Sequence, residues 1–219
     1  MGLSSTTWFV IAVIIVLLGV GLLFVDRKQQ GGSAAVKDRR RWAALRGWEF
    51  LDTDPVLPSR WRYGTIHQGG PGVAKNLISG EVPLPDGARQ AYIFDHEQAG
   101  RVTSVLAAIQ SQTQLNAAVE LRLPTAPVPD DVALEYLEPV GERYAFVSDA
   151  DADAVRPLLT RRLARAADAV GDDVELLWAE ESWVLATAPV ESSADRLQEL
   201  LADLAEVATA LEQGQNAHT

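Results

Sequence analysis

The sequence predicts an α+β protein in which an N-terminal transmembrane helix is followed by one domain with a mainly antiparallel sheet and two or three packed helices. An unbroken apolar run fills residues 8–25, short alternating segments bounded by turn residues fill the middle of the chain, and apolar side chains recur at helical spacing near the C-terminus. The predicted parts are a transmembrane anchor over 1–27, a basic juxtamembrane linker and helix over 28–46, an α+β domain over 47–212 and a disordered tail over 213–219.

The apolar run WFVIAVIIVLLGVGLLFV is about 27 Å long as a helix and so reaches most of the hydrocarbon core of a bilayer. A cleaved signal peptide is the alternative, but it needs a positive N-terminal region and a small-residue cleavage site. The chain has no charged residue before the run, and Asp26, Arg27 and Lys28 stand directly after it. We therefore expect the helix to stay in the mature protein.

Cations gather on the C-terminal side of the apolar run. The positive-inside rule then predicts a single-pass protein of the inner membrane, with its N-terminus outside and its domain in the cytoplasm. We name these cations the basic collar and expect them on the anionic membrane surface. The collar consists of Arg27, Lys28, Lys37, Arg39, Arg40 and Arg41. The whole chain carries a net charge of −11, so the remainder is acidic, which argues against nucleic acid as a partner.

The first half of the domain is predicted to begin with a helix and continue with short strands. Apolar spacing and a following glycine indicate a helix over residues 35–46 that ends at Gly47. Pro85 to Gly87 supply turn chemistry between two strand candidates, which indicates a hairpin. The strand candidates lie at 48–52, 73–82, 90–96, 102–109, 117–123, 132–137 and 143–147.

The second half is predicted to contain two helices and one more hairpin. Apolar residues from Val155 to Val170 recur every three or four positions, which indicates an amphipathic helix over 151–169. Strand candidates at 174–179 and 183–188 form the hairpin, and the last helix starts near Ser192.

A heptad seam marks that last helix. It consists of Leu197, Leu200, Leu204, Val207 and Leu211. Two heptads are too few for a free coiled coil. The seam therefore either docks on the domain's own sheet or forms a surface for a partner helix.

Asp149, Asp151 and Asp153 follow a predicted strand and superficially resemble a calcium loop or an aspartate nucleophile motif. A calcium loop needs glycine at its sixth position and glutamate at its twelfth, where this chain has Ala154 and Thr160. Helix capping explains the three aspartates better. The absence of cysteine also excludes thiol nucleophiles and thiolate metal sites.

The histidines give no stronger sign of chemistry. They are His67, His96 and His218, and on a strand His96 faces away from both Asp95 and Glu97. We therefore predict no catalytic residue, no metal site and no cofactor. The enzyme that remains as an alternative is a metal- or phosphate-dependent hydrolase that uses Asp149, Asp151 and His96.

Several short motifs recur in a familiar order. They are Leu45 to Trp48, Asp54-Pro55, Asn76-Leu77 with Gly80, Phe94-Asp95, Leu121 to Pro124 and Phe146 to Asp149. In this order, over about residues 40–210, the chain resembles a family of uncharacterised single-pass membrane proteins common in actinobacteria. The resemblance carries no established activity. Some small anchored proteins of such bacteria are accessory subunits of respiratory assemblies, and the resemblance implies a similar role.

The function predicted from these observations is a non-catalytic, membrane-anchored interaction or accessory module on the cytoplasmic face, for which a subunit of an envelope or respiratory assembly is one form. Its expected partners are membrane lipids, through the N-terminal helix and the basic collar, and a membrane protein. The hydrolase is one alternative, and a lipid-binding domain, which needs an open apolar cavity in the sheet, is the other.

Overall fold

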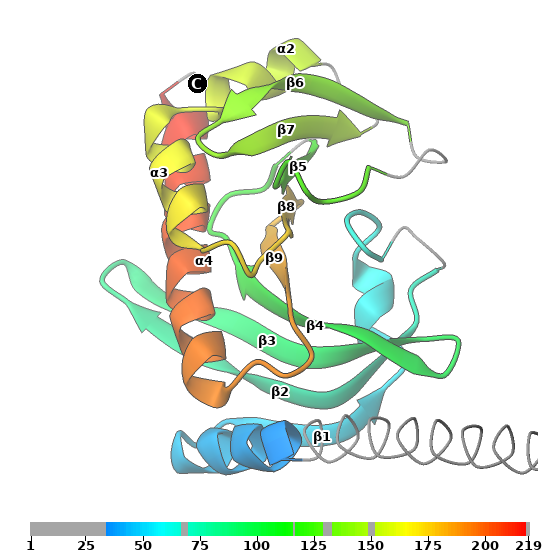
Figure 1. Cartoon of the computed structure of the whole chain (residues 1–219). Helices are drawn as coiled ribbons and strands as arrows, with labels where there is room; N and C mark the ends of the chain where they lie inside the picture. Colours follow the sequence, from blue (N-terminus) through cyan, green and yellow to red (C-terminus); the bar gives the residue numbers. More distant parts are fainter. Residues whose placement is uncertain (1–33, 67–69, 116, 129–132, 149–151, 218–219) are drawn as a thin grey trace, which may run out of the picture.

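One antiparallel sheet of nine strands organises the protein (Figure 1). The computed structural model describes residues 34–66, 70–115, 117–128, 133–148 and 152–217. The strands are β1 (Glu49–Asp54), β2 (Val73–Leu84), β3 (Gly87–Gln98), β4 (Arg101–Gln110), β5 (Ala118–Arg122), β6 (Leu134–Val140), β7 (Arg143–Ser148), β8 (Leu176–Glu180) and β9 (Trp183–Ala188). Their order across the sheet is β1-β2-β3-β4-β9-β8-β5-β7-β6.

Pairs of consecutive strands build most of this order, and three pairings between non-consecutive strands complete it: β4 with β9, β5 with β8 and β5 with β7. The β2–β3 hairpin turns at Gly87, whose φ of 131° is open to glycine and strained for other residues. The β8–β9 hairpin joins the two halves of the sheet, because β9 pairs with β4 and β8 pairs with β5. All residues of β8 are buried, so the middle of the sheet is covered on both faces.

The core on one face of the sheet receives side chains from the helix over residues 34–45, from α3 (Arg161–Ala169) and from α4 (Ala194–Asn216). Ser193 caps α4, because its side chain accepts a hydrogen bond from the backbone N–H of Arg196. Figure 1 shows α4 running along the sheet from its lower to its upper half. The helix over 34–45 is joined to α4 by Trp42, whose Nε1 donates to Gln198 Oε1 at 3.2 Å.

The last turns of α4 are held by a buried carboxylate. Glu212 accepts hydrogen bonds from Arg89 Nη1 at 2.7 Å, Ser111 Oγ at 2.8 Å and the backbone N–H of Gln112 at 2.8 Å. These contacts fix the helix to β3 and to the end of β4. As a result α4 continues to Asn216, four residues into the segment predicted as a disordered tail over 213–219.

The opposite face of the sheet is crossed by residues 55–66, which we name the strap. It contains the short 3₁₀ helix η1 (Leu57–Arg60) and is the cyan segment in Figure 1. Leu57, Trp61 and Ile66 of the strap are buried and form a second apolar cluster with side chains of the sheet. This cluster is separate from the core under α4, so the sheet packs apolar side chains on both of its faces.

The predicted fold class was wrong. Its transmembrane helix at 8–25 lies outside the described residues, and among residues 34–66, 70–115, 117–128, 133–148 and 152–217 no helix is long and apolar enough to cross a membrane. The predicted location, a single-pass inner-membrane protein with a cytoplasmic domain, depended on that helix and is corrected for the same reason. The architecture found is a nine-stranded antiparallel sheet with helices on one face.

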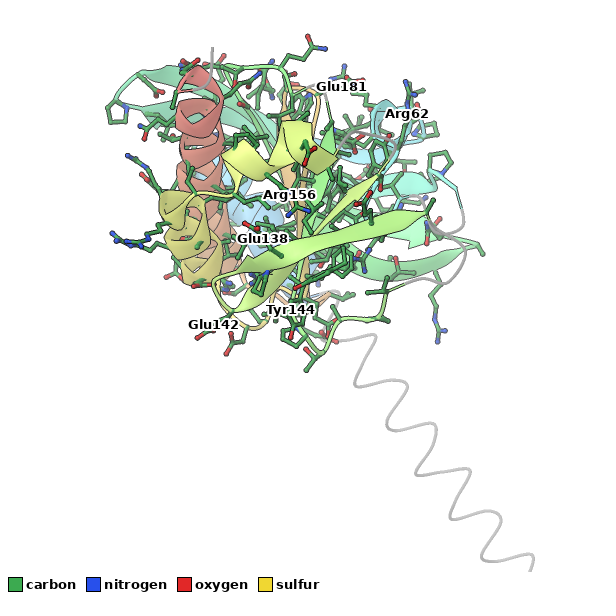
Figure 2. The ribbon with its side chains drawn as sticks, turned by 90° about the horizontal axis from the view of Figure 1, so that it is seen from above. Arg62, Glu138, Glu142, Tyr144, Arg156 and Glu181 are labelled. Carbon is green, nitrogen blue, oxygen red and sulfur yellow. The ribbon has the colours of Figure 1, made fainter. Side chains whose placement is uncertain are left out.

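The single helix predicted over 151–169 is broken into three pieces. They are α2 (Ala152–Val155), the 3₁₀ helix η2 (Arg156–Leu158) and α3, which starts anew after its cap Thr160. Pro157 explains the break, because proline lacks the N–H that an α-helix needs and clashes with the preceding turn. Arg156 is thereby directed toward Glu138 of β6, with Nη1 and Oε2 3.6 Å apart (Figure 2).

Candidate functional site

The basic collar does not act as one surface. Arg39 is only 2% exposed, and its Nη1 lies 2.7 Å from Asp95 Oδ1 on β3, so its assignment to the membrane surface was wrong. The physical reason is its position on the inner side of the helix over 34–45. Lys37, Arg40 and Arg41 are exposed, and their surface role stays a prediction. The other two collar residues, Arg27 and Lys28, lie outside the described residues.

The heptad seam of α4 lies inside the protein. Its residues are Leu197, Leu200, Leu204, Val207 and Leu211, each 4% exposed or less and part of the core on the helix-covered face. Of the two interpretations of the seam, docking on the domain's own sheet matches this burial. A partner helix would find no seam side chain to contact on the folded domain.

The residues of the hydrolase hypothesis are only partly described. His96 is fully buried on β3, and its Nε2 donates to the backbone oxygen of Pro71 at 3.0 Å. Burial lowers the pKa of His96, so the ring is neutral at physiological pH. Asp149 and Asp151 lie outside the described residues, as do His67 and His218. Within the described ranges no three metal-binding side chains lie close enough to hold an ion.

Two buried glutamates bind the backbone of the strap to the sheet. Glu180 of β8 accepts hydrogen bonds from the backbone N–H of Arg62 at 3.0 Å, from that of Tyr63 at 3.4 Å and from Trp178 Nε1 at 3.0 Å. Glu120 of β5 accepts one from the backbone N–H of Gly64 at 2.9 Å.

Arg122 neutralises Glu120, with Nε and Nη2 at 2.8 and 2.6 Å from its Oε2. The two glutamates were missed in the sequence, although a glutamate inside an apolar strand such as LLWAE or AVELR is a sign of a buried acceptor.

Aromatic side chains pack between the strap and the sheet. Trp61 of the strap stacks on Phe94 with ring centroids 6.0 Å apart, and it forms a T-shaped pair with Trp183 with ring centroids 5.6 Å apart. At Gly64, which has a φ of 64°, an added Cβ would lie 2.6 Å from the indole of Trp178. Only glycine therefore lets the strap approach the sheet this closely.

The strap borders two hollows, and each is lined by both polar and apolar side chains. The first hollow has a volume of about 500 Å³, and Leu51 and Val56 on its wall are 51% and 69% exposed. Charged side chains also line it, namely Glu49, Asp54 and Arg60. The second hollow has a volume of about 440 Å³ and meets the strap at Thr65. Its lining combines polar side chains such as Gln98 and Thr187 with apolar ones such as Leu176 and Pro189. Among the described residues that line the two hollows, none forms a nucleophile and base pair.

Burial raises the pKa of Glu180 even though three N–H groups donate to it. Because the folded-state pKa lies above the ordinary value of 4.5, the contribution of Glu180 to stability is complete below that pH and is lost as the pH rises through the raised pKa. We expect the Glu180→Gln variant to lack this decline. The measurement is the free energy of unfolding in urea as a function of pH.

The matched control is Glu191→Gln, at an exposed glutamate that is not among the charges acting on Glu180. If the free energy of unfolding changes with pH in the same way in the wild type and in Glu180→Gln, Glu180 is not the group that causes the decline.

The family model described as "Trehalose monomycolate transport factor TtfA" matches residues 5–211. The chain belongs to the TtfA family. A TtfA relative, Trehalose monomycolate transport factor A of Mycolicibacterium smegmatis, is 27% identical over 186 residues. That match covers 85% of this chain and 63% of the relative, so the chain spans less than two thirds of the length of that protein.

A solved TtfA structure has a similar fold. It is the crystal structure of the mycobacterial trehalose monomycolate transport factor A, with a TM-score of 0.70 and 25% identity, covering 81% of this chain and 94% of that one. The TtfA family is one of transport factors and not of enzymes, which confirms the prediction that the chain is not an enzyme. The predicted resemblance was correct at the level of an actinobacterial family, but that family is TtfA, which has a described role.

Proposed function

We propose that this chain is a non-catalytic accessory factor in the transport of trehalose monomycolate or a closely related trehalose glycolipid. The observation that carries the proposal is the family match over residues 5–211, which extends through the whole described sheet, the strap and almost all of α4. A mycobacterial protein of this family is named for that transport.

The geometry of the strap face supports a role in binding. A glycolipid has an apolar part and a hydroxyl-rich part, and the two hollows beside the strap both offer apolar and polar side chains. Exposed Leu51 and Val56 offer apolar surface that an acyl chain can cover. This feature also favours the lipid-binding alternative. Binding of the glycolipid would then be the means by which the accessory factor acts. Its protein partner would be the membrane protein that moves the lipid.

A chimera tests the proposal. Residues 5–211 of this chain would replace the matched segment of the Mycolicibacterium smegmatis relative in cells depleted of the native protein, which keeps the part of the relative that this chain does not cover. Labelled trehalose monomycolate should build up in the depleted cells and return to the level of undepleted cells when the chimera is expressed. Continued accumulation with the chimera present at normal abundance would argue against the proposed function.

A further inference from the structure

We propose that the outer face of the helix over residues 34–45 docks on a membrane surface that contains anionic lipid headgroups. Three exposed side chains, Lys37, Arg41 and Leu45, follow one another at four-residue spacing and so lie in line along this helix. We name them the outer stripe. The other side of the helix is turned inward, because Trp42 and Ala43 belong to the core. Figure 1 shows the helix at the end of the molecule where the edge strand β1 lies.

The two cations of the outer stripe are not neutralised by the protein itself. Within the described ranges, neither Lys37 nor Arg41 forms an ion pair. The acidic residue of the same helix, Asp38, is turned to α4, where its Oδ2 accepts a hydrogen bond from the backbone N–H of Ala194 at 3.3 Å. The whole chain carries a net charge of −11, so an anionic surface repels most of the protein and attracts the stripe. Charge therefore favours one orientation of the domain on such a surface.

The position of the helix in the chain favours lipid as the source of the negative charge. Only residues 26–33 separate it from the uncharged apolar run over 8–25. Fully extended, this connection reaches about 30 Å at most. Apolar side chains are more favourable in lipid than in water, so a lipid layer that covers the run lies within reach of the outer stripe.

The composition of the outer stripe also suits a lipid surface better than an acidic protein. A protein interface needs a well-packed apolar centre, and the stripe offers one large apolar side chain, Leu45, which is 76% exposed. Headgroups make no such demand, because cations attract them without a fixed geometry and each Lys or Arg near the surface strengthens the attraction. Leu45 can enter the layer while the stems of Lys37 and Arg41 let their charges stay among the phosphates.

The test measures how close the outer stripe lies to lipid headgroups when the full chain is reconstituted in vesicles. The sequence has no cysteine, so Ala44→Cys, at an exposed position beside the stripe, carries a single NBD fluorophore. The vesicles consist of phosphatidylcholine, with or without phosphatidylglycerol, and include a lipid whose headgroup bears a nitroxide quencher. We expect quenching at least about twofold stronger with phosphatidylglycerol, and a return to the neutral level in high salt, which screens the charges.

Charge variants identify the outer stripe as the contact. Lys37→Gln/Arg41→Gln should weaken docking roughly tenfold or more and lower the quenching to that in neutral vesicles, whereas Lys37→Arg/Arg41→Lys should preserve it. The matched control is Arg161→Gln/Arg165→Gln, which removes two exposed cations of α3 and should leave the quenching unchanged. A fluorophore at Glu142→Cys, on the exposed turn between β6 and β7 near the other edge of the sheet, should be quenched weakly in both kinds of vesicle (Figure 2).

Three results would each overturn the inference. Equal quenching in the two kinds of vesicle would leave the outer stripe to an acidic protein partner. Equal losses in the two charge-removing variants, or quenching as strong at Glu142→Cys as at Ala44→Cys, would mean that the stripe does not make the contact. The chimera tests the transport role separately, and neither result decides the other.

Discussion

Replacement of Asp95 by alanine should lower the free energy of unfolding by about 3–5 kcal/mol, because it leaves a buried guanidinium without a counter-charge. Arg39 and Asp95 are 2% and 5% exposed at their side chains, and Asn76 Nδ2 also donates to Asp95 Oδ2 at 2.7 Å. The ion pair joins the helix over 34–45 to β3. Urea denaturation followed by tryptophan fluorescence gives the measurement.

Two variants complete this test. The double variant Arg39→Met/Asp95→Leu removes both charges and keeps the volume, so it should recover most of the lost stability. Arg41→Ala, an exposed member of the basic collar, should change stability by about 0.5 kcal/mol or less. A loss for Asp95→Ala as small as that for Arg41→Ala would contradict the buried ion pair.

Gly64→Ala should destabilise the protein by roughly 2–4 kcal/mol. Part of this loss, about 1 kcal/mol, comes from placing alanine at a positive φ. The rest, about 1–3 kcal/mol, comes from the Cβ that would lie 2.6 Å from the Trp178 ring and push the strap away from the sheet. The free energy of unfolding in urea measures the total.

Gly47 provides the matched control for this variant. Its φ of 69° is close to that of Gly64, but an added Cβ would meet no atom within 4 Å. Gly47→Ala should therefore show only the conformational part of the loss. Equal losses for the two variants would mean that the strap does not lie against Trp178.

Local sequence signals predicted the hairpins because each depends on neighbouring residues. The turn at Pro85 to Gly87 and the alternating residues around it correspond to the β2–β3 hairpin, and the two segments flanking Glu181 correspond to β8 and β9. The pairings of β9 with β4 and of β8 with β5 join segments far apart in the chain. No local pattern specifies such pairings, so the sequence predicted the strands without their order.

The helical errors have a different origin. Apolar spacing from Val155 to Val170 describes one face of a helix, but Pro157 interrupts the backbone hydrogen bonds on which that helix depends. Arg39 was assigned to the membrane surface from charge alone, since its buried partner Asp95 comes from a distant strand.

The candidate site was the least predictable part of the molecule. In the sequence, the strap has the pattern of a proline-containing connection. Its role depends on Glu120 and Glu180, which come from strands far along the chain and bind backbone N–H groups of the strap. Side chains that bind backbone leave no pattern in the residues that they hold.

The most direct test of the transport role measures whether the strap must lie against the sheet for glycolipid transport. Chimeras with and without Gly64→Ala would be expressed at equal abundance in depleted Mycolicibacterium smegmatis, with the Gly47→Ala chimera as control, and labelled trehalose monomycolate would be measured. We expect normal glycolipid levels with the unaltered and Gly47→Ala chimeras and accumulation with the Gly64→Ala chimera. If the Gly64→Ala chimera fully restores glycolipid transport while its strap is shown to be displaced from the sheet, the strap face does not serve transport.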